Sequence, residues 1–223
     1  MKKQRPHPLQ NKVDPWGELQ AVRMVGALMG NRGILHDEED RIVRRWANKS
    51  WVCCSLNETF QKRSPFSPGT YSELFFLDEA TAYAAGHRPC HTCRRQAHDA
   101  FNKAWTAANS ERVGTPNAGH LPITTVDAHL HTERLGAGKR KLAHMTKLGD
   151  LPVGAMFAVK DAAVLVGPSG LRRWSFSGYQ NFPGIAMDTQ VALLTPPSIV
   201  ASIRYGLTVQ IHPSGVADSI SGD

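Results

Sequence analysis

The most informative stretch of this chain reads Gly86-His87-Arg88-Pro89-Cys90-His91-Thr92-Cys93-Arg94-Arg95, and it contains two of the four cysteines. A C-x-x-C turn points both sulfur atoms at a common point about 2.3 Å from each, which is the geometry of a bound metal ion. A helical pattern follows at once, and a helix N-terminus favours thiolates. The stretch therefore predicts half of a tetrahedral zinc (Zn²⁺) site.

The other half of this site has to come from elsewhere in the chain. Cys53 and Cys54 are adjacent in an expected strand over residues 50–56. A regular strand offers one of two neighbours to a given site, whereas a bulge or a strand end presents both. We take all four cysteines as candidate ligands, with three histidines as substitutes: His36, His87 and His91. The alternative is buried thiols or a redox pair, although the thioredoxin-like βαβ context of a redox pair is missing.

Composition places the chain among folded globular proteins. It has 223 residues, 41% of them hydrophobic and 20% charged, enough for one sizeable domain or two small ones. No apolar run approaches the roughly 18 residues that cross a bilayer, and the first residues lack the apolar core of a signal peptide. We therefore expect a cytoplasmic protein without a membrane segment, and four cysteines in that setting do not indicate a disulfide scaffold.

Positive charge is concentrated in the first two thirds of the chain. The net charge is +7, yet residues 151–223 contain four basic and four acidic side chains. Residues 1–150 thus carry the whole excess, which favours nucleic acid as partner, DNA over RNA; a solvated basic face is the alternative. Candidate phosphate contacts are Arg88, Arg94, Arg95, Arg134, Lys139, Arg140 and Lys141. Cationic and aromatic residues also alternate over 172–182, a pattern that a hairpin with one buried face explains better.

Local patterns predict an α+β fold in three regions. Residues 1–18 form a basic flexible arm, residues 19–150 a zinc-stabilised, nucleic-acid-binding region, and residues 151–223 a neutral, mostly antiparallel sheet with one or two helices packed against it. In the zinc-stabilised region we expect helices over 18–29, 79–85, 93–108 and 124–135, a hairpin joining 41–46 to 50–56, and a strand over 71–76. After residue 150 we expect a meander over 155–176, strands over 191–194 and 207–211, and a helix over 196–205 with Thr195 as its N-cap.

A second group of candidate chemical residues is Asp127, His129, His131 and Glu133. On a helix they form two i, i+4 pairs on different faces, so they do not meet at one ion. On an extended segment alternate residues point to the same face, so all four side chains would lie together. Such a group could bind the metal ion of a metal-dependent nuclease or another nucleic-acid hydrolase. We list them as candidate catalytic residues and favour a polar surface helix.

Residues 71–95 resemble the second half of the zinc-binding domain of Ada-type DNA-alkylation repair proteins. The resemblance lies in Phe75-Phe76, Glu79-Ala80, Ala84-Ala85-Gly86 and Arg88-Pro89-Cys90-x-x-Cys93-Arg94. It implies that Cys90 and Cys93 are two of four cysteine ligands and that the domain binds the DNA backbone. A further cysteine of that family accepts a methyl group from a damaged phosphate. The family's first pair is spaced C-x-x-x-C, unlike Cys53-Cys54, so the methyl-acceptor role is not carried over.

These observations favour a zinc-stabilised DNA-binding protein acting in DNA repair or defence. Two alternatives stay open: a nucleic-acid hydrolase using residues 127–133, and a zinc-stabilised protein-interaction module whose basic surface meets an acidic partner.

Overall fold

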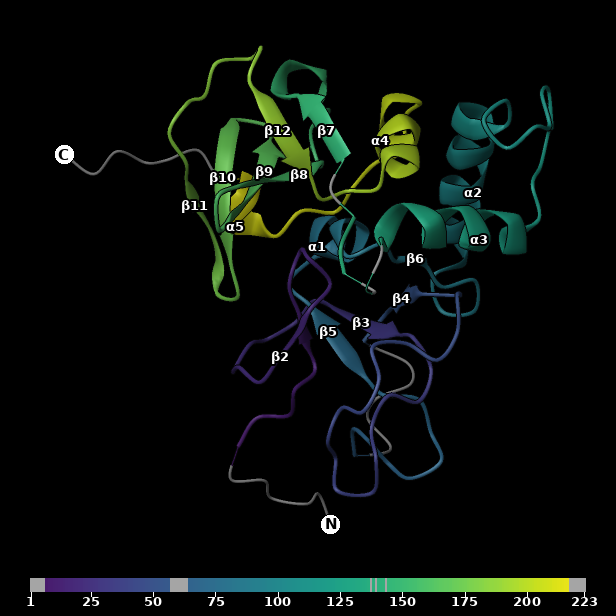
Figure 1. Ribbon diagram of the computed structural model, residues 1–223, viewed down its shortest axis with the longest axis vertical. Coiled ribbons are helices and arrows are strands. Elements are labelled where there is room, and N and C mark those ends of the chain that lie inside the picture. The colour runs from purple at the N-terminus through teal and green to yellow at the C-terminus, as the bar shows by residue number, and fades with distance from the viewer. Residues whose placement is uncertain (1–6, 57–63, 137, 139, 143, 217–223) are drawn as a thin grey trace.

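The computed structural model describes residues 7–56, 64–136, 138, 140–142 and 144–216. Its described residues form two six-stranded sheets and five α-helices, so the predicted α+β class is confirmed. Helix α1 (Glu79–Ala84) lies between the two sheets, and α2, α3 and α4 gather to one side (Figure 1).

The first sheet is built from very short strands in the order β2-β1-β5-β3-β4-β6. Two neighbouring pairs, β1/β5 and β4/β6, are parallel, and the other three are antiparallel. The strands are β1 (Lys12–Val13), β2 (Leu19–Gln20), β3 (Leu28–Asn31), β4 (Val52–Cys54), β5 (Leu74–Phe76) and β6 (Arg88–Pro89). The parallel pair β4/β6 brings the two cysteine-bearing segments side by side.

The arm expected over residues 1–18 contributes the two-residue strand β1 to this sheet. Lys12 pairs with Phe75 of β5, and Val13 is fully buried. Residues 1–6 lie outside the described residues. The sequence did not predict this strand, because it has only two residues in a polar segment and one of its two partners, β5, lies some 60 residues further along the chain.

The helix expected over residues 18–29 is wrong. Leu19 lies in β2, Leu28 lies in β3, and the chain between them has no helix. Val25, expected on the buried face, is 93% exposed. The apolar spacing was coincidental: Leu19 and Leu28 enter one core through two different strands of the same sheet.

The hairpin expected between residues 41–46 and 50–56 is also wrong. Its second arm does contain β4, but β4 pairs with β3 on one side and β6 on the other. From the first arm, Ile42 forms only an isolated bridge with His36. The prediction assumed a tight turn at residues 47–49, whereas β4 pairs with strands that lie further away in the chain.

Three other predicted helices, those over residues 79–85, 93–108 and 124–135, are confirmed. The side chain of Asp78 caps α1 by accepting the Thr81 backbone N–H at 2.8 Å, and Gly86 follows with φ +83°. The two longer helices are α2 (Arg95–Asn109) and α3 (Ile123–Arg134). Each begins within two residues of the expected range.

The second sheet is antiparallel throughout, in the order β11-β10-β9-β8-β12-β7. It confirms the predicted meander and adds β7 before residue 151, whereas residues 207–211 are not a strand. Its strands are β7 (His144–Lys147), β8 (Met156–Val159), β9 (Ala162–Gly167), β10 (Gly170–Ser175), β11 (Gly178–Asn181) and β12 (Gln190–Leu193). The same part of the chain contains the 3-10 turn η2 (Leu148–Asp150) and the helices α4 (Pro197–Arg204) and α5 (Pro213–Val216).

Helix α1 joins the second sheet to the first. The Tyr179 hydroxyl donates to the Asp78 carboxylate at 2.8 Å, and the Trp174 indole N–H donates to the Thr81 hydroxyl at 3.0 Å. One apolar cluster contains Ala80 of α1 and Leu165 of β9. The strand-rich last part therefore packs on the same short helix that leads into the C-x-x-C turn.

Replacing Gly30 with Ala is expected to destabilise the fold by about 1–3 kcal/mol. A Cβ atom there would lie 2.4 Å from a ring carbon of Phe76, in the middle of the first sheet. Urea unfolding followed by circular dichroism measures the effect. Gly184→Ala is the control, because no atom lies within 4 Å of its added Cβ. Equal stability of the two variants would contradict this packing.

Candidate metal centre

Three cysteines meet at one end of the parallel pair β4/β6. In this register Val52 lies beside Arg88 and Cys53 beside Pro89, so Cys54 and Cys90 follow at the same end of their strands. The turn after β6 then returns Cys93 to them. The sulfur atoms of Cys54, Cys90 and Cys93 all lie within 4.8 Å of one another. Three sulfurs at this spacing can bind one metal ion.

The surroundings of the three sulfurs suit thiolate ligands. Hydrogen bonds lower the pKa of the Cys90 thiol: the largest effect comes from the Cys54 thiol, and the backbone N–H groups of Cys93 and Thr92 add to it. The hydrogen bond to Cys90 in turn raises the pKa of the Cys54 thiol, and burial and the negative charge of Cys90 add to this. Burial also raises the pKa of Cys93. Without a cation the three thiols resist ionising together, so a bound cation would stabilise all three thiolates.

Cys53, an expected candidate ligand, does not join this group. It is fully buried on the other face of β4, in the apolar core of the first sheet. Its sulfur accepts a hydrogen bond from Arg94 at 3.1 Å, and Arg94 also pairs with Glu79 at 2.7 Å. Burial raises the pKa of the Cys53 thiol to about 12. Strand alternation thus selects one cysteine of the adjacent pair.

None of the three substitute histidines joins the cysteine group among the described residues. His36 stacks on Phe66 with ring centres 4.5 Å apart and bonds to the Ser72 hydroxyl. His87 is fully buried, and burial lowers its pKa well below the ordinary value. His91 is exposed.

The cysteine group borders an open cavity of about 530 Å³. Cys93 lines it together with Ser55, Arg94, Arg95 and Gln96. Within the described part of the chain, the group offers three ligands, one fewer than a closed structural zinc site has.

No family model, curated protein or solved structure matches this chain. In the described ranges, no helix is both long enough and apolar enough to cross a membrane. The function therefore has to be inferred from the side chains and cavities themselves.

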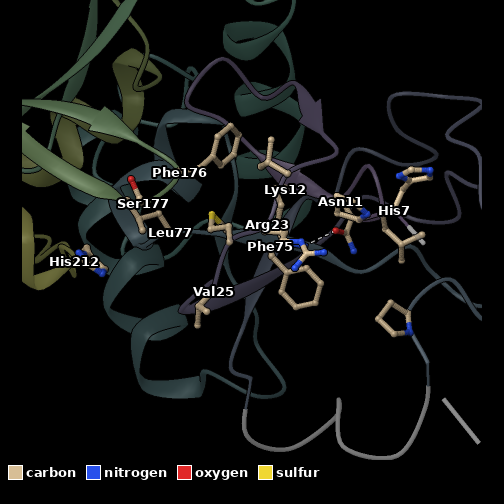
Figure 2. A pocket seen from close by; sticks show the side chains of 15 residues that line it. His7, Asn11, Lys12, Arg23, Val25, Phe75, Leu77, Phe176, Ser177 and His212 are labelled. Carbon is tan, nitrogen blue, oxygen red and sulfur yellow. Dashed lines mark hydrogen bonds between the residues drawn. The ribbon is translucent and has the colours of Figure 1, made fainter. Parts of the chain in front are cut away.

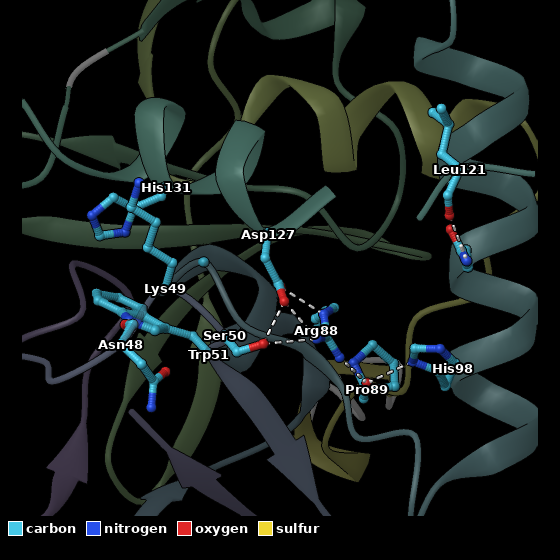
Figure 3. Close-up of polar contacts among 12 residues, drawn as sticks. Asn48, Lys49, Ser50, Trp51, Arg88, Pro89, His98, Leu121, Asp127 and His131 are labelled. Atoms are coloured by element: carbon cyan, nitrogen blue, oxygen red, sulfur yellow. Dashed lines mark hydrogen bonds and ion pairs between the residues drawn. The ribbon is translucent and has the colours of Figure 1, made fainter. Parts of the chain in front are cut away.

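Asp127 of α3, a candidate catalytic residue, is the buried partner of Arg88. The Arg88 guanidinium donates two hydrogen bonds of 2.7 Å to the two oxygens of the Asp127 carboxylate. Ser50 donates to the same carboxylate from the segment before β4 (Figure 3). The side chains of Arg88 and Asp127 are 5% and 6% exposed. Both candidates therefore hold α3 against the first sheet.

The other three candidates on α3 also have structural partners. Glu133 accepts hydrogen bonds from the backbone and the hydroxyl of Ser198 at the start of α4, and from His129 at 3.2 Å. His131 bonds to Arg134 and packs edge-on against Trp46. Because the segment is helical, the four side chains lie on two faces, and no metal-binding group among the described residues includes them.

Three of the seven expected phosphate contacts are not on the surface. Arg88, Arg94 and Arg134 are largely buried and use their donors on groups within the protein. Arg95 is exposed and pairs with Asp99, and Arg140 is exposed. Lys141 is half-buried, and Lys139 lies outside the described residues. The sequence shows how many charged residues the chain has, but not which of them are buried in the fold.

A basic groove of about 760 Å³ lies instead between the first sheet and the tip of the β10–β11 hairpin. Figure 2 shows Lys12, Arg23 and Phe75 close together in it, with Phe176 and His212 further along. None of the fifteen described residues that line the groove is acidic. The lining residues come from six separate segments of the chain, so no local sequence motif predicted the groove.

Proposed function

We propose that this protein is a zinc-stabilised nucleic-acid-binding protein. It binds single-stranded nucleic acid, DNA in preference to RNA, in the groove of Figure 2. The observation that carries the proposal is a groove with cations and aromatic rings and without a carboxylate among its described lining residues. Phosphates bind to cations, and bases of any sequence stack on aromatic faces.

Lys12 and Arg23 are suited to phosphate contacts. The Lys12 ammonium lies 4.7 Å from the centre of the Phe75 ring and donates to the Asn11 side chain at 2.7 Å. Burial lowers its pKa, so an anion beside it would favour the charged form. Arg23 is exposed at the groove wall. Phe75 supplies a ring surface next to Lys12, and Phe176 supplies a second one further along the groove.

The metal's part in this proposal is structural. Cys54, Cys90 and Cys93 would hold zinc, a metal for which thiolates are preferred ligands. The ion would tie β4, β6 and the start of α2 together and so hold the shape of the first sheet, whose strand β5 supplies Phe75 to the groove. The resemblance of residues 71–95 to a DNA-binding zinc domain supports the same partner. A role in repair or defence and a cytoplasmic location belong to this proposal.

The test is fluorescence anisotropy with a labelled single-stranded oligonucleotide over a range of salt concentrations. We expect Lys12→Gln/Arg23→Gln to weaken binding roughly tenfold or more and to reduce the salt slope by about 1.4. The control Lys103→Gln/Lys147→Gln removes the same charge from exposed sites outside the groove. Equal loss in both variants would refute the groove, and no binding of any strand at low salt would refute nucleic-acid binding.

A further inference from the structure

A second group of cations surrounds Trp51, which does not line the groove. The guanidinium carbons of Arg32 and Arg134 lie 4.1 Å and 3.9 Å from the centre of the Trp51 ring. Both arginines are 1% exposed. The Lys141 ammonium reaches the same place and donates to the carbonyl oxygen of Ala84. We call Arg32, Arg134 and Lys141 the cation cluster.

The groups that accept hydrogen bonds from the cation cluster are neutral. Arg32 donates to the carbonyl oxygen of Gly17 at 2.9 Å and to a ring nitrogen of His87 at 3.1 Å. Arg134 donates to the carbonyl oxygens of Gly86 and Lys49. Among the described residues, no carboxylate forms an ion pair with any of the three cations.

Two hydrogen-bond donors of the cluster have no acceptor among the described residues. Arg32 Nη2 and Arg134 Nε are buried and have no hydrogen-bond partner among the described residues. A buried donor on a charged group is normally satisfied, so each is evidence for a group that binds there. The nearby carboxylates are already engaged: Glu18 pairs with Arg45, and Asp14 accepts two backbone N–H groups.

A small cavity lies where the cluster meets. All three cations line it, together with Trp51 and the Glu18–Arg45 ion pair. Its volume is about 10 Å³ for the centre of a water-sized sphere, which is room for one atom-sized body. A phosphate or sulfate ion, with four oxygens, is too large for it.

The positive charges that line the cavity favour the binding of an anion. Burial, together with the charges of Arg134 and Arg32, lowers the pKa of Lys141 to about 7. Burial likewise lowers the pKa of Arg32 and of Arg134 to about 9. A water molecule would fill the space without offsetting these charges, whereas one anion would offset them and accept the two free donors.

We propose that the cation cluster binds a single monatomic anion of the halide class, chloride under physiological conditions. The site is independent of the proposed nucleic-acid groove, with which it shares no lining residue. The bound ion would join the turn at Gly17, the end of α3 and the segment after it around Trp51.

The direct test is a crystal of the wild-type protein soaked in sodium bromide, with data collected at the bromine absorption edge. We expect an anomalous peak in the cavity, in contact with Arg32 Nη2 and Arg134 Nε. A cavity that holds only a peak without bromine signal is a water site and overturns the proposal.

The test in solution is thermal unfolding against chloride concentration, with gluconate, too large for the cavity, keeping the ionic strength constant. Above the dissociation constant, each tenfold rise in chloride should raise the wild-type midpoint by about 3–6 °C. Lys141→Met should reduce this dependence, whereas the control Lys147→Met, on exposed β7, should keep it. A midpoint that ignores chloride, or equal dependence in the two variants, overturns the proposal.

Discussion

Cys54→Ala is expected to abolish metal binding, whereas Cys53→Ala is expected to retain it. The two residues are neighbours, but only the Cys54 sulfur lies with those of Cys90 and Cys93. Binding of structural zinc contributes about 10–16 kcal/mol in small zinc domains, so loss of a ligand should lower the unfolding midpoint by about 10 °C or more. Elemental analysis of the purified variants and calorimetry measure the two effects.

Cys53→Ala is a demanding control, because the residue is itself fully buried. It removes a core sulfur and one partner of Arg94, so a cost of about 1–2 kcal/mol is expected with the metal still bound. Removing the metal from the wild type with a chelator should reproduce the Cys54→Ala phenotype and have no further effect on that variant. Metal loss in Cys53→Ala with retention in Cys54→Ala would refute the assignment, and wild-type protein without metal would refute the centre itself.

The sequence predicted those parts of the fold that short-range chemistry determines. The Asp78 cap, the periodic faces of α2 and α3, and the turn-separated strands after residue 155 depend on residues close together in the chain. In the first sheet, β4 and β5 lie within the strands expected over 50–56 and 71–76, but the other strands and the pairing were not predicted, because the strands have two to four residues and most of them pair with distant segments. Strands this short have no period to detect.

The same limit applies to the candidate site. The C-x-x-C spacing identified Cys90 and Cys93, and strand alternation reduced the adjacent pair to one ligand. The choice of Cys54 rests on the register between β4 and β6, which local sequence does not encode. Nor does it reveal that Arg88 meets a buried carboxylate, since 39 residues separate the pair.

Asp127→Ala is expected to cost about 3–5 kcal/mol of folding stability, because it leaves Arg88 buried without its counter-ion. The matched control is Asp99→Ala, which breaks the exposed pair with Arg95 and should cost less than about 1 kcal/mol. Urea unfolding measures both. The side chains of the first pair are 5% and 6% exposed and those of the second 66% and 60%, so the comparison isolates burial.

A double variant separates structure from catalysis at this position. Arg88→Met/Asp127→Leu removes both charges, and it should recover much of the stability that Asp127→Ala loses, since the cost comes from an unpaired buried charge. A catalytic carboxylate would behave in the opposite way: Asp127→Ala would leave stability near that of the wild type and abolish cleavage of nucleic acid in magnesium or manganese. That outcome would overturn the structural role of Asp127 and restore α3 as the candidate active site. Stability lost in the single variant and regained in the double variant would instead identify the Arg88–Asp127 pair as the link that holds α3 against the cysteine-bearing strands.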